Sequence, residues 1–282
     1  MKAFLLTTFA MLAFAANSII GRMALIENAG SASIDAASYT SIRLLSGAFV
    51  LLLILVIRKC DLKIKNINSV SALMLFTYAV CFSFSYINIA TGTGALILFG
   101  SVQLTMILSG IVKGDYPGIQ ATSGTIIAFS GLIYLLLPGV SAPPLNSALL
   151  MAMAGIAWGI YSLRGRGVKN PLIATSWNFI GTLPLVLITT IIFHHESHIT
   201  SKGMTLAILS GALASGMGYA IWYTALPYLS SMRAATVQLT VPVIASIGGV
   251  ILLSETVSLR LVIASIAVLG GVYLTIKSHH IK

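Results

Sequence analysis

One arginine lies well inside an apolar stretch of the sequence. A helix that begins near Ala36 would place Arg43 about 10 Å along its axis. The planar guanidinium of arginine binds carboxylates and phosphates through two parallel hydrogen bonds. Arg43 is therefore a candidate for binding an anionic group on a small solute. Tyr39 and either Ser46 or Gly47 lie about one turn to each side of it, which favours an inward-facing side of this helix.

A second interpretation of Arg43 needs no substrate. Long basic side chains within a membrane extend toward the polar headgroups or pair with a neighbouring acid. Asp35 and Glu27 are the acids that precede Arg43 most closely in the sequence. The sequence leaves open whether Arg43 binds a solute, reaches the membrane surface or pairs with one of these acids.

The acids and histidines all fall in predicted loops or at predicted helix ends. They are Glu27, Asp35, Asp61, Asp115, Glu196, Glu255, His194, His195, His198, His279 and His280. Proton-driven pumps usually keep a titratable group inside the membrane, so coupling through a buried acid is disfavoured. The histidines of the loop at 193–200 have no cysteine or second cluster beside them. We expect no metal site, no cofactor and no catalytic residue.

Polar and aromatic side chains in the other apolar stretches complete the candidate binding site. With Tyr39 and Arg43, the set contains Asn17, Tyr78, Gln103, Trp158, Tyr161, Trp177, Asn178, Tyr219, Trp222 and Gln238. Tryptophan and tyrosine also form interfacial belts, and asparagine and glutamine also bond neighbouring helices, so each residue has a structural alternative. Trp158, Asn178, Gln103 and Gln238 are favoured because they lie several residues from either end of their stretch.

The composition places these residues in a lipid bilayer. Of the 282 residues, 57% are apolar and 8% are charged, whereas soluble domains carry about 25% charged residues. A water-soluble enzyme and a disordered chain are both excluded. A transmembrane helix needs about 20 residues, so the chain has room for ten spans with short loops and no sizeable soluble domain.

Ten apolar stretches are separated by charges, prolines or clusters of glycine, serine and asparagine. They run at 3–21, 36–57, 69–89, 93–112, 119–137, 147–163, 172–193, 203–226, 234–253 and 259–276. The predicted fold class is an all-α membrane protein with ten transmembrane helices.

The basic residues predict the orientation of the chain. With the N-terminus inside, twelve of the 16 lysines and arginines fall on the inside, and Arg22, Lys202 and Arg260 fall in outside loops. Both termini are then cytoplasmic in a multi-pass protein of the cell inner, or plasma, membrane. This asymmetry and anionic lipid headgroups account for the net charge of +10, so we expect the bilayer and no nucleic acid as a partner.

An internal repeat is indicated when the sequence is aligned with itself at an offset of 140 residues. Asp115 then falls on Glu255 and Gly131 on Gly271. Five helices per half is an odd number, so the halves would insert in opposite orientations, as in many secondary transporters. We predict two inverted five-helix repeats, at 1–140 and 141–282.

The second half carries a family resemblance. The segment RAATVQLTVPVIASIGGVILLSETVSLRLVIASIAVLGGVYL, with the ten-helix pattern and Arg43, resembles the EamA branch of the drug/metabolite transporter superfamily. The matching features are the small residues Ala234 and Ala235, the mid-helix Pro242, the acid Glu255 and the pair Gly270 and Gly271. The first half matches more loosely, with Val102 at the proline position and Asp115 as the acid. The resemblance implies export of amino acids, metabolites or drugs.

Transport of a small molecule explains these features better than two other classes of function. A membrane-embedded enzyme would be expected to show clustered acids or histidines, and a receptor-like bundle would need long loops or a partner-binding domain. We therefore predict a secondary transporter and no enzyme. It would export an amino acid or related metabolite by alternating access, as a monomer or weak dimer. Efflux of an amphipathic or aromatic drug-like compound is the alternative, and Arg43 favours the former.

Overall fold

The computed structural model describes residues 2–26, 32–60, 67–112, 118–137, 139, 142–165, 168–229, 234 and 237–278. Within these ranges the regular structure is helical, apart from an isolated antiparallel bridge between Ile34 and Ile199. The main helices are α1 (Lys2–Leu25), α2 (Ala36–Ile57), α3 (Ser69–Tyr86), α4 (Thr91–Val112), α5 (Ile119–Leu136), α6 (Leu145–Gly165), α7 (Pro171–Gly181), α8 (Leu183–Ile192), α9 (Ser201–Leu209), α10 (Gly218–Ala225), α12 (Thr240–Leu253) and α13 (Leu259–Ser278). A π-helix, η3 (Ser210–Met217), joins α9 to α10, and the short turns η2 (His194–Glu196) and η4 (Leu226–Tyr228) are 3₁₀-helical.

These helices make the ten predicted spans. Seven apolar segments of 18 or more residues are long enough to cross a membrane, with α7 and α8 forming one of them and the run from α9 to η4 another. Three shorter apolar helices lie at 122–136, 240–253 and 259–274. The ten-helix prediction is confirmed, and most boundaries agree with the predicted ones within a few residues.

Two spans differ from the prediction in ways that bear on the site. Helix α1 continues to Leu25, so Arg22 lies in its last turn and not in a loop as predicted. The seventh span is broken at Thr182, whose N–H and hydroxyl both bond the carbonyl of Phe179. Pro184 lies two residues later in the first turn of α8, and because proline has no N–H it cannot continue the hydrogen-bond ladder.

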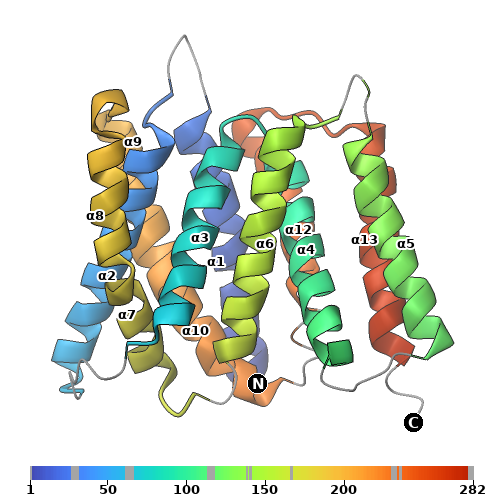
Figure 1. The fold of residues 1–282 in the computed structure, drawn as a ribbon, viewed down its shortest axis with the longest axis horizontal. Coiled ribbons are helices and arrows are strands. Elements are labelled where there is room, and N and C mark those ends of the chain that lie inside the picture. Colours follow the sequence, from blue (N-terminus) through green and yellow to red (C-terminus); the bar gives the residue numbers. More distant parts are fainter. Residues whose placement is uncertain are drawn as a thin grey trace.

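The helices run up and down between two ends of the bundle (Figure 1). Helix α1 begins and α13 ends at the same edge, the lower one in this view, as an even number of crossings requires. We call the opposite edge, where α1 ends, the Arg22 end, and the lower edge, where α6 ends, the Arg164 end. The cytoplasmic position of the termini stays a prediction.

The two predicted halves interleave in space. Helix α5 packs on α13, α3 and α4 pack on α6, and α2 packs on η3, so each pair joins one half to the other. Figure 1 shows α5 and α13 side by side at one flank of the bundle. The repeats at 1–140 and 141–282 remain a prediction, and the two halves are not separate bodies.

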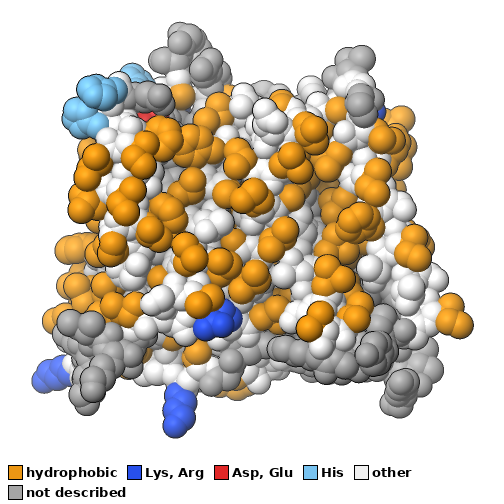
Figure 2. Space-filling model, viewed as in Figure 1, with side chains coloured by type: hydrophobic (Ala, Val, Ile, Leu, Met, Phe, Trp, Pro, Cys, Tyr) orange, Lys and Arg blue, Asp and Glu red, His pale blue; other side chains and the backbone are white. Residues whose placement is uncertain are grey.

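The outer surface is suited to lipid. Large apolar side chains such as Phe49, Leu187 and Ile251 are exposed. Figure 2 shows apolar side chains over the height of one face, most of the visible lysines and arginines along the lower edge, and histidines at an upper corner. Buried aromatic and polar side chains fill the interior, where the candidate site lies.

Candidate functional site

Six buried polar residues meet in the middle of the bundle. We call them the central polar cluster: Asn17 from α1, Arg43 from α2, Tyr78 from α3, Ser210 and Ser215 from η3, and Tyr219 from α10. The sequence predicts four of the six as site residues. Segments far apart in the chain therefore converge on a single point.

Arg43 is the centre of the cluster and is 1% exposed. Its Nε donates to the Ser215 hydroxyl at 2.9 Å, and its Nη2 donates to the hydroxyls of Tyr78 and Tyr219 at 3.1 and 2.8 Å. The guanidinium carbon lies 5.1 Å from the centroid of the Tyr78 ring and 4.7 Å from that of Phe82, within cation–π range. The remaining nitrogen, Nη1, is buried and has no hydrogen-bond partner among the described residues.

The charge of Arg43 is not neutralised by an acid of the described chain. No described carboxylate lies within 4.0 Å of it, since the one salt bridge among the described residues joins Arg22 to Glu255. Asp35 instead accepts hydrogen bonds from the N–H groups of Ser38 and His198 at 2.8 and 2.9 Å. The interpretations in which Arg43 reaches the surface or pairs with Asp35 are therefore wrong, and Glu27 lies outside the described residues.

Asn17 ties the first helix to the same centre. Its amide nitrogen donates to the Tyr78 hydroxyl at 3.0 Å, and its amide oxygen accepts from Ser210 at 2.6 Å and from Ser215 at 3.4 Å. Tyr219 also donates to Tyr78 at 3.0 Å. The hydroxyls and the amide thus orient one another around the guanidinium.

The π-helix explains how two serines reach one amide oxygen. Ser210 and Ser215 are five residues apart, a spacing that puts side chains roughly 140° apart on an α-helix. In a π-helix the backbone bonds reach back five residues, so this spacing brings both side chains to one face. Composition alone does not reveal a π-helix, and no pattern in the sequence indicates the roles of these two serines.

Glycine permits the close approach of η3 to α2. A Cβ atom on Gly211 would lie 2.1 Å from the carbonyl oxygen of Arg43, and one on Gly47 would lie 3.0 Å from the carbonyl oxygen of Gly211. Both distances are shorter than ordinary van der Waals contact. The small residues of this run therefore let the helix that carries the serines pack directly on the helix that carries Arg43.

An aromatic wall adjoins the cluster and lines a small cavity. Its lining residues are Phe14, Ser18, Tyr78, Leu98, Phe99, Trp158 and Tyr219. The Trp158 ring contacts those of Tyr78, Tyr219 and Phe14 at centroid distances of 5.1, 4.5 and 5.3 Å. The cavity has room for about one water molecule. An organic solute would require these walls to separate.

Tyr161 and Asn178 lie one layer away from the cluster. The Asn178 amide donates to the Tyr161 hydroxyl at 3.4 Å, and the Tyr161 ring stacks on Trp158 at 5.3 Å. Tyr39 is buried one turn before Arg43, and Trp222 packs edge-to-face on Phe14. Tyr161 and Trp222 therefore support the wall of the cavity.

The other predicted residues are buried but do not line this cavity. They are Gln103 on α4, Trp177 on α7 and Gln238, which precedes α12. The amide nitrogen of Gln238 donates to the Ala234 carbonyl, four residues earlier, at 3.1 Å. This is a local bond within its own segment. No three acids, histidines or cysteines of the described part of the chain are grouped as metal ligands.

Ten apolar helices around a buried polar centre define a polytopic membrane protein of the transporter type. Residues 145–277 match the profile of the EamA-like transporter family. A protein of Pseudomonas aeruginosa, described as uncharacterized, is 46% identical over 97% of this chain and 94% of its own length. The chain belongs to the EamA-like transporter family, which is a family of transporters and not of enzymes.

More distant relatives agree with this assignment. An uncharacterized transporter of Archaeoglobus fulgidus is 28% identical over 82% of this chain and 85% of its own length. A protein of Salmonella typhimurium named a probable amino-acid metabolite efflux pump is 20% identical over 73% of this chain and 74% of its own length. A crystal structure with 16% identity superposes with a TM-score of 0.65, covering 97% of this chain and 96% of the other. It shares the fold.

Proposed function

We propose that this transporter exports an amino acid or a related carboxylated metabolite, and that Arg43 binds the carboxylate. The observation that carries the proposal is a fully buried guanidinium with no acid of the described chain beside it and with Nη1 unbonded. A buried charge without a counter-charge costs several kcal/mol, so a solute that brings a carboxylate compensates for part of that cost.

The geometry around Arg43 supports an anion in particular. Nη1 is a free donor, and the hydroxyls of Tyr78 and Tyr219 can rotate to donate to an incoming oxygen. Hydrogen bonds between a guanidinium and a carboxylate are charge-assisted and roughly twice as strong as neutral ones. A cationic solute would instead be repelled.

Alternating access accounts for the closed cavity. The walls come from α1, α3, α4, α6 and α10, which belong to both predicted halves, so a relative movement of the halves would open the cavity to one side at a time. The solute's own gradient or exchange for a second solute would supply the driving force. The name of the Salmonella relative supports the direction and the solute class.

The aromatic wall supports a second candidate function, efflux of an amphipathic or aromatic compound. Phe14, Phe99 and Trp158 present ring surface to the cavity without a charge. An apolar solute would use this surface and would not need Arg43. The two candidates therefore differ in whether a carboxylate is required.

Proteoliposomes that contain the purified protein test the choice. Initial uptake and efflux rates are measured for a panel of labelled amino acids, the primary amide of each and a lipophilic dye. Our proposal predicts that some amino acids are transported at least tenfold faster than their amides, as the contribution of a charge-assisted bond implies. Transport of amides and dye at rates equal to or above those of the acids would favour the second candidate.

The predicted orientation, with both termini cytoplasmic, is tested with reporter fusions. A reporter fused after Lys282 should be active only in the cytoplasm, and a reporter inserted at His195 only outside. Activity of both in the same compartment would contradict the predicted orientation.

A further inference from the structure

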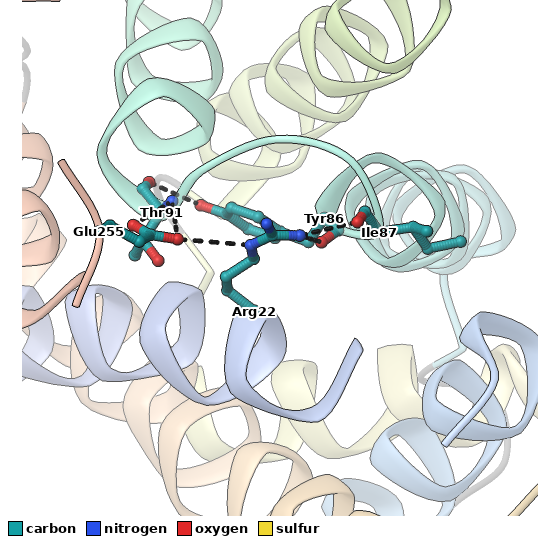
Figure 3. Close-up of polar contacts among 5 residues, drawn as sticks. All are labelled: Arg22, Tyr86, Ile87, Thr91 and Glu255. Carbon is teal, nitrogen blue, oxygen red and sulfur yellow. Dashed lines mark hydrogen bonds and ion pairs between the residues drawn. The ribbon is translucent and has the colours of Figure 1, made fainter. Parts of the chain in front are cut away.

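A second arginine forms a partly buried ion pair near the Arg22 end of the bundle (Figure 3). The Nε of Arg22 lies 3.3 Å from Oε1 of Glu255, and the two side chains are 13% and 12% exposed. The Nη1 of Arg22 donates to the carbonyls of Tyr86 and Ile87, both at 2.7 Å. The Glu255 carboxylate accepts from the N–H of Thr91 at 2.8 and 3.1 Å.

These contacts join four elements at one place. Arg22 is on the last turn of α1, the two carbonyls are at the end of α3, Thr91 begins α4, and Glu255 follows α12. Each charge also complements a helix end. The Arg22 guanidinium lies at the C-terminal end of α3, which carries a partial negative charge, and the Glu255 carboxylate lies at the N-terminal start of α4, which carries a partial positive charge. Removing either side chain would therefore break a polar link between α1 or α12 and the turn between α3 and α4.

The ion pair lies on the side of the central cavity that faces the Arg22 end. Ser18 lines the cavity, and Arg22 follows four residues later on the same face of α1, about 6 Å along the axis. On α3, three aromatic rings spaced four residues apart extend from the cavity toward the ion pair. Tyr78 at the cavity contacts Phe82 at 5.5 Å, and Phe82 contacts Tyr86 at 4.6 Å.

The ring series also connects the ion pair to the proposed carboxylate site. Phe82 lies 4.7 Å from the Arg43 guanidinium carbon and also contacts the Tyr86 ring, at a centroid distance of 4.6 Å. A solute that draws Arg43 toward itself would change the packing of Phe82. The carbonyl of Tyr86 is one of the acceptors of Arg22, so such a change would reach the ion pair through direct contacts.

We propose that Arg22 and Glu255 form the gate that closes the solute pathway at the Arg22 end, and that the pair separates when the cavity opens there. The conformation with the ion pair formed is then closed at this end. This inference rests on the proposed alternating access, but it does not depend on the identity of the solute.

Accessibility of the cavity wall tests the gate without any solute. Ser18→Cys is introduced into a Cys60→Ser, Cys81→Ser background, and its reaction rate with a membrane-impermeant maleimide is measured from each side of the membrane. A separate protein with His195→Cys identifies the Arg22 end, because His195 is exposed there.

Arg22→Gln and Glu255→Gln are then each combined with the Ser18→Cys reporter. We expect either variant to raise the labelling rate from the Arg22 end by about ten- to a hundredfold, as the loss of a bond between charged groups implies. The rate from the Arg164 end should not rise. Arg260→Gln is the matched control, since Arg260 lies at the same end but bonds the Leu137 carbonyl and no acid of the described chain.

Two results would overturn the gate. One is an unchanged labelling rate in both glutamine variants, and the other is an equal rise from both ends, which indicates general loosening of the bundle. If a glutamine variant does not fold, Arg22→Lys and Glu255→Asp retain both charges with weakened contacts. They should raise labelling from the Arg22 end by a smaller factor, and an unchanged rate in both would also overturn the gate.

Failure of the gate and failure of the proposed function are distinguishable. A gate that opens in the glutamine variants while no carboxylated solute is transported would support the gate and contradict the carboxylate proposal. Transport of amino acids without any effect of the glutamine variants on labelling would support the carboxylate proposal and contradict the gate.

Discussion

Two arginines face the interior of this bundle, and they differ in what surrounds their charge. Arg22 meets a carboxylate and two carbonyl oxygens at one end, so its charge is largely satisfied by the protein. Arg43 meets three hydroxyls and two rings at the centre, with one nitrogen unbonded. The same side chain can therefore fasten helices in one region and remain available to a ligand in the other.

The surroundings of Arg22 and Arg43 differ because the acids of the described chain occur at helix ends and not beside Arg43. Glu255 lies at the end of an apolar helix and reaches a helix end that offers an N–H group, which is a favourable environment for a carboxylate. No comparable position exists beside Arg43 among the described residues, because the helices around it carry serines, tyrosines and small residues. The central polar cluster therefore surrounds the charge of Arg43 with hydroxyl and amide groups but provides no described acid to neutralise it.

The largest expected effect concerns the packing beneath Arg43. Gly211→Ala would place a Cβ 2.1 Å from a backbone oxygen, which cannot move aside without displacing α2. We expect a loss of about 3 kcal/mol or more in the free energy of unfolding, because overpacking against backbone lies at or above the upper end of its usual cost. Gly249→Ala at the Arg22 end meets the end of the Glu255 side chain, which can turn aside at the expense of its bonds to Arg22 and Thr91, and should cost less. Chemical denaturation in detergent measures both, with Gly270→Ala as the control because its space is open.

A smaller loss is expected at the hydroxyls around Arg43. Tyr78→Phe and Tyr219→Phe each leave Nη2 with one acceptor, whereas the double variant leaves it with none among the described residues. Each single variant also removes the Tyr219–Tyr78 bond, so the sum of the two single losses counts that bond twice. The double variant should still lose about 1 kcal/mol more than this sum, because it leaves the buried charged Nη2 without either acceptor. A double-mutant cycle of unfolding free energies measures this coupling. Strict additivity would show that the two hydroxyls act independently.

Arg164, whose side chain lies at the start of α3, can be compared with Arg22, whose side chain lies at the end of α3, because only Arg22 has an acid of the described chain as a partner. Arg164 donates to the side-chain oxygens of Ser71 and Asn68 at 3.2 and 3.1 Å and has no described acid beside it. We expect Arg164→Gln to cost about 1 kcal/mol of unfolding free energy or less, and Arg22→Gln about 1.5–3 kcal/mol. Equal costs would show that the ion pair adds nothing to neutral hydrogen bonds.

The smallest effect is expected from the proton gradient. The residues that line the cavity contain no acid and no histidine, and Arg43 has no carboxylate of the described chain within 4.0 Å. Collapsing the gradient in substrate-loaded vesicles should therefore leave solute exchange largely intact. Loss of exchange would mean that an acid such as Glu255 takes part in proton coupling. The Arg22–Glu255 ion pair and the central polar cluster would then not have separate roles.

Much of the architecture is predictable because lipid imposes a simple rule on long apolar stretches. The spans at 36–57 and 119–136 match the predicted ones to within one residue. A charge usually ends an apolar span, and for this reason the sequence predicts a loop at Arg22. The structure keeps Arg22 in α1, since Glu255 and two carbonyls satisfy it.

The site is predictable in its residue types and not in its geometry. Asn17, Arg43, Tyr78 and Tyr219 are polar residues in apolar stretches, and this pattern selects them together with residues outside the central polar cluster, such as Gln103 and Gln238. Ser210 and Ser215 escape prediction as a pair, because the π-helix that brings them to one face depends on packing against α2. Long-range packing of this kind leaves no periodic pattern in the sequence.

The role of Arg43 is tested most directly by the initial transport rate per folded transporter for a carboxylated solute and for its primary amide. It is measured in the wild type, Arg43→Lys and Arg43→Gln. We predict that Arg43→Lys transports the acid more slowly, because a point charge replaces a two-point donor. Arg43→Gln should lower the acid rate by roughly ten- to a hundredfold and remove the preference for acid over amide. An unchanged ratio of acid to amide in all three proteins would contradict the role of Arg43 in binding the carboxylate.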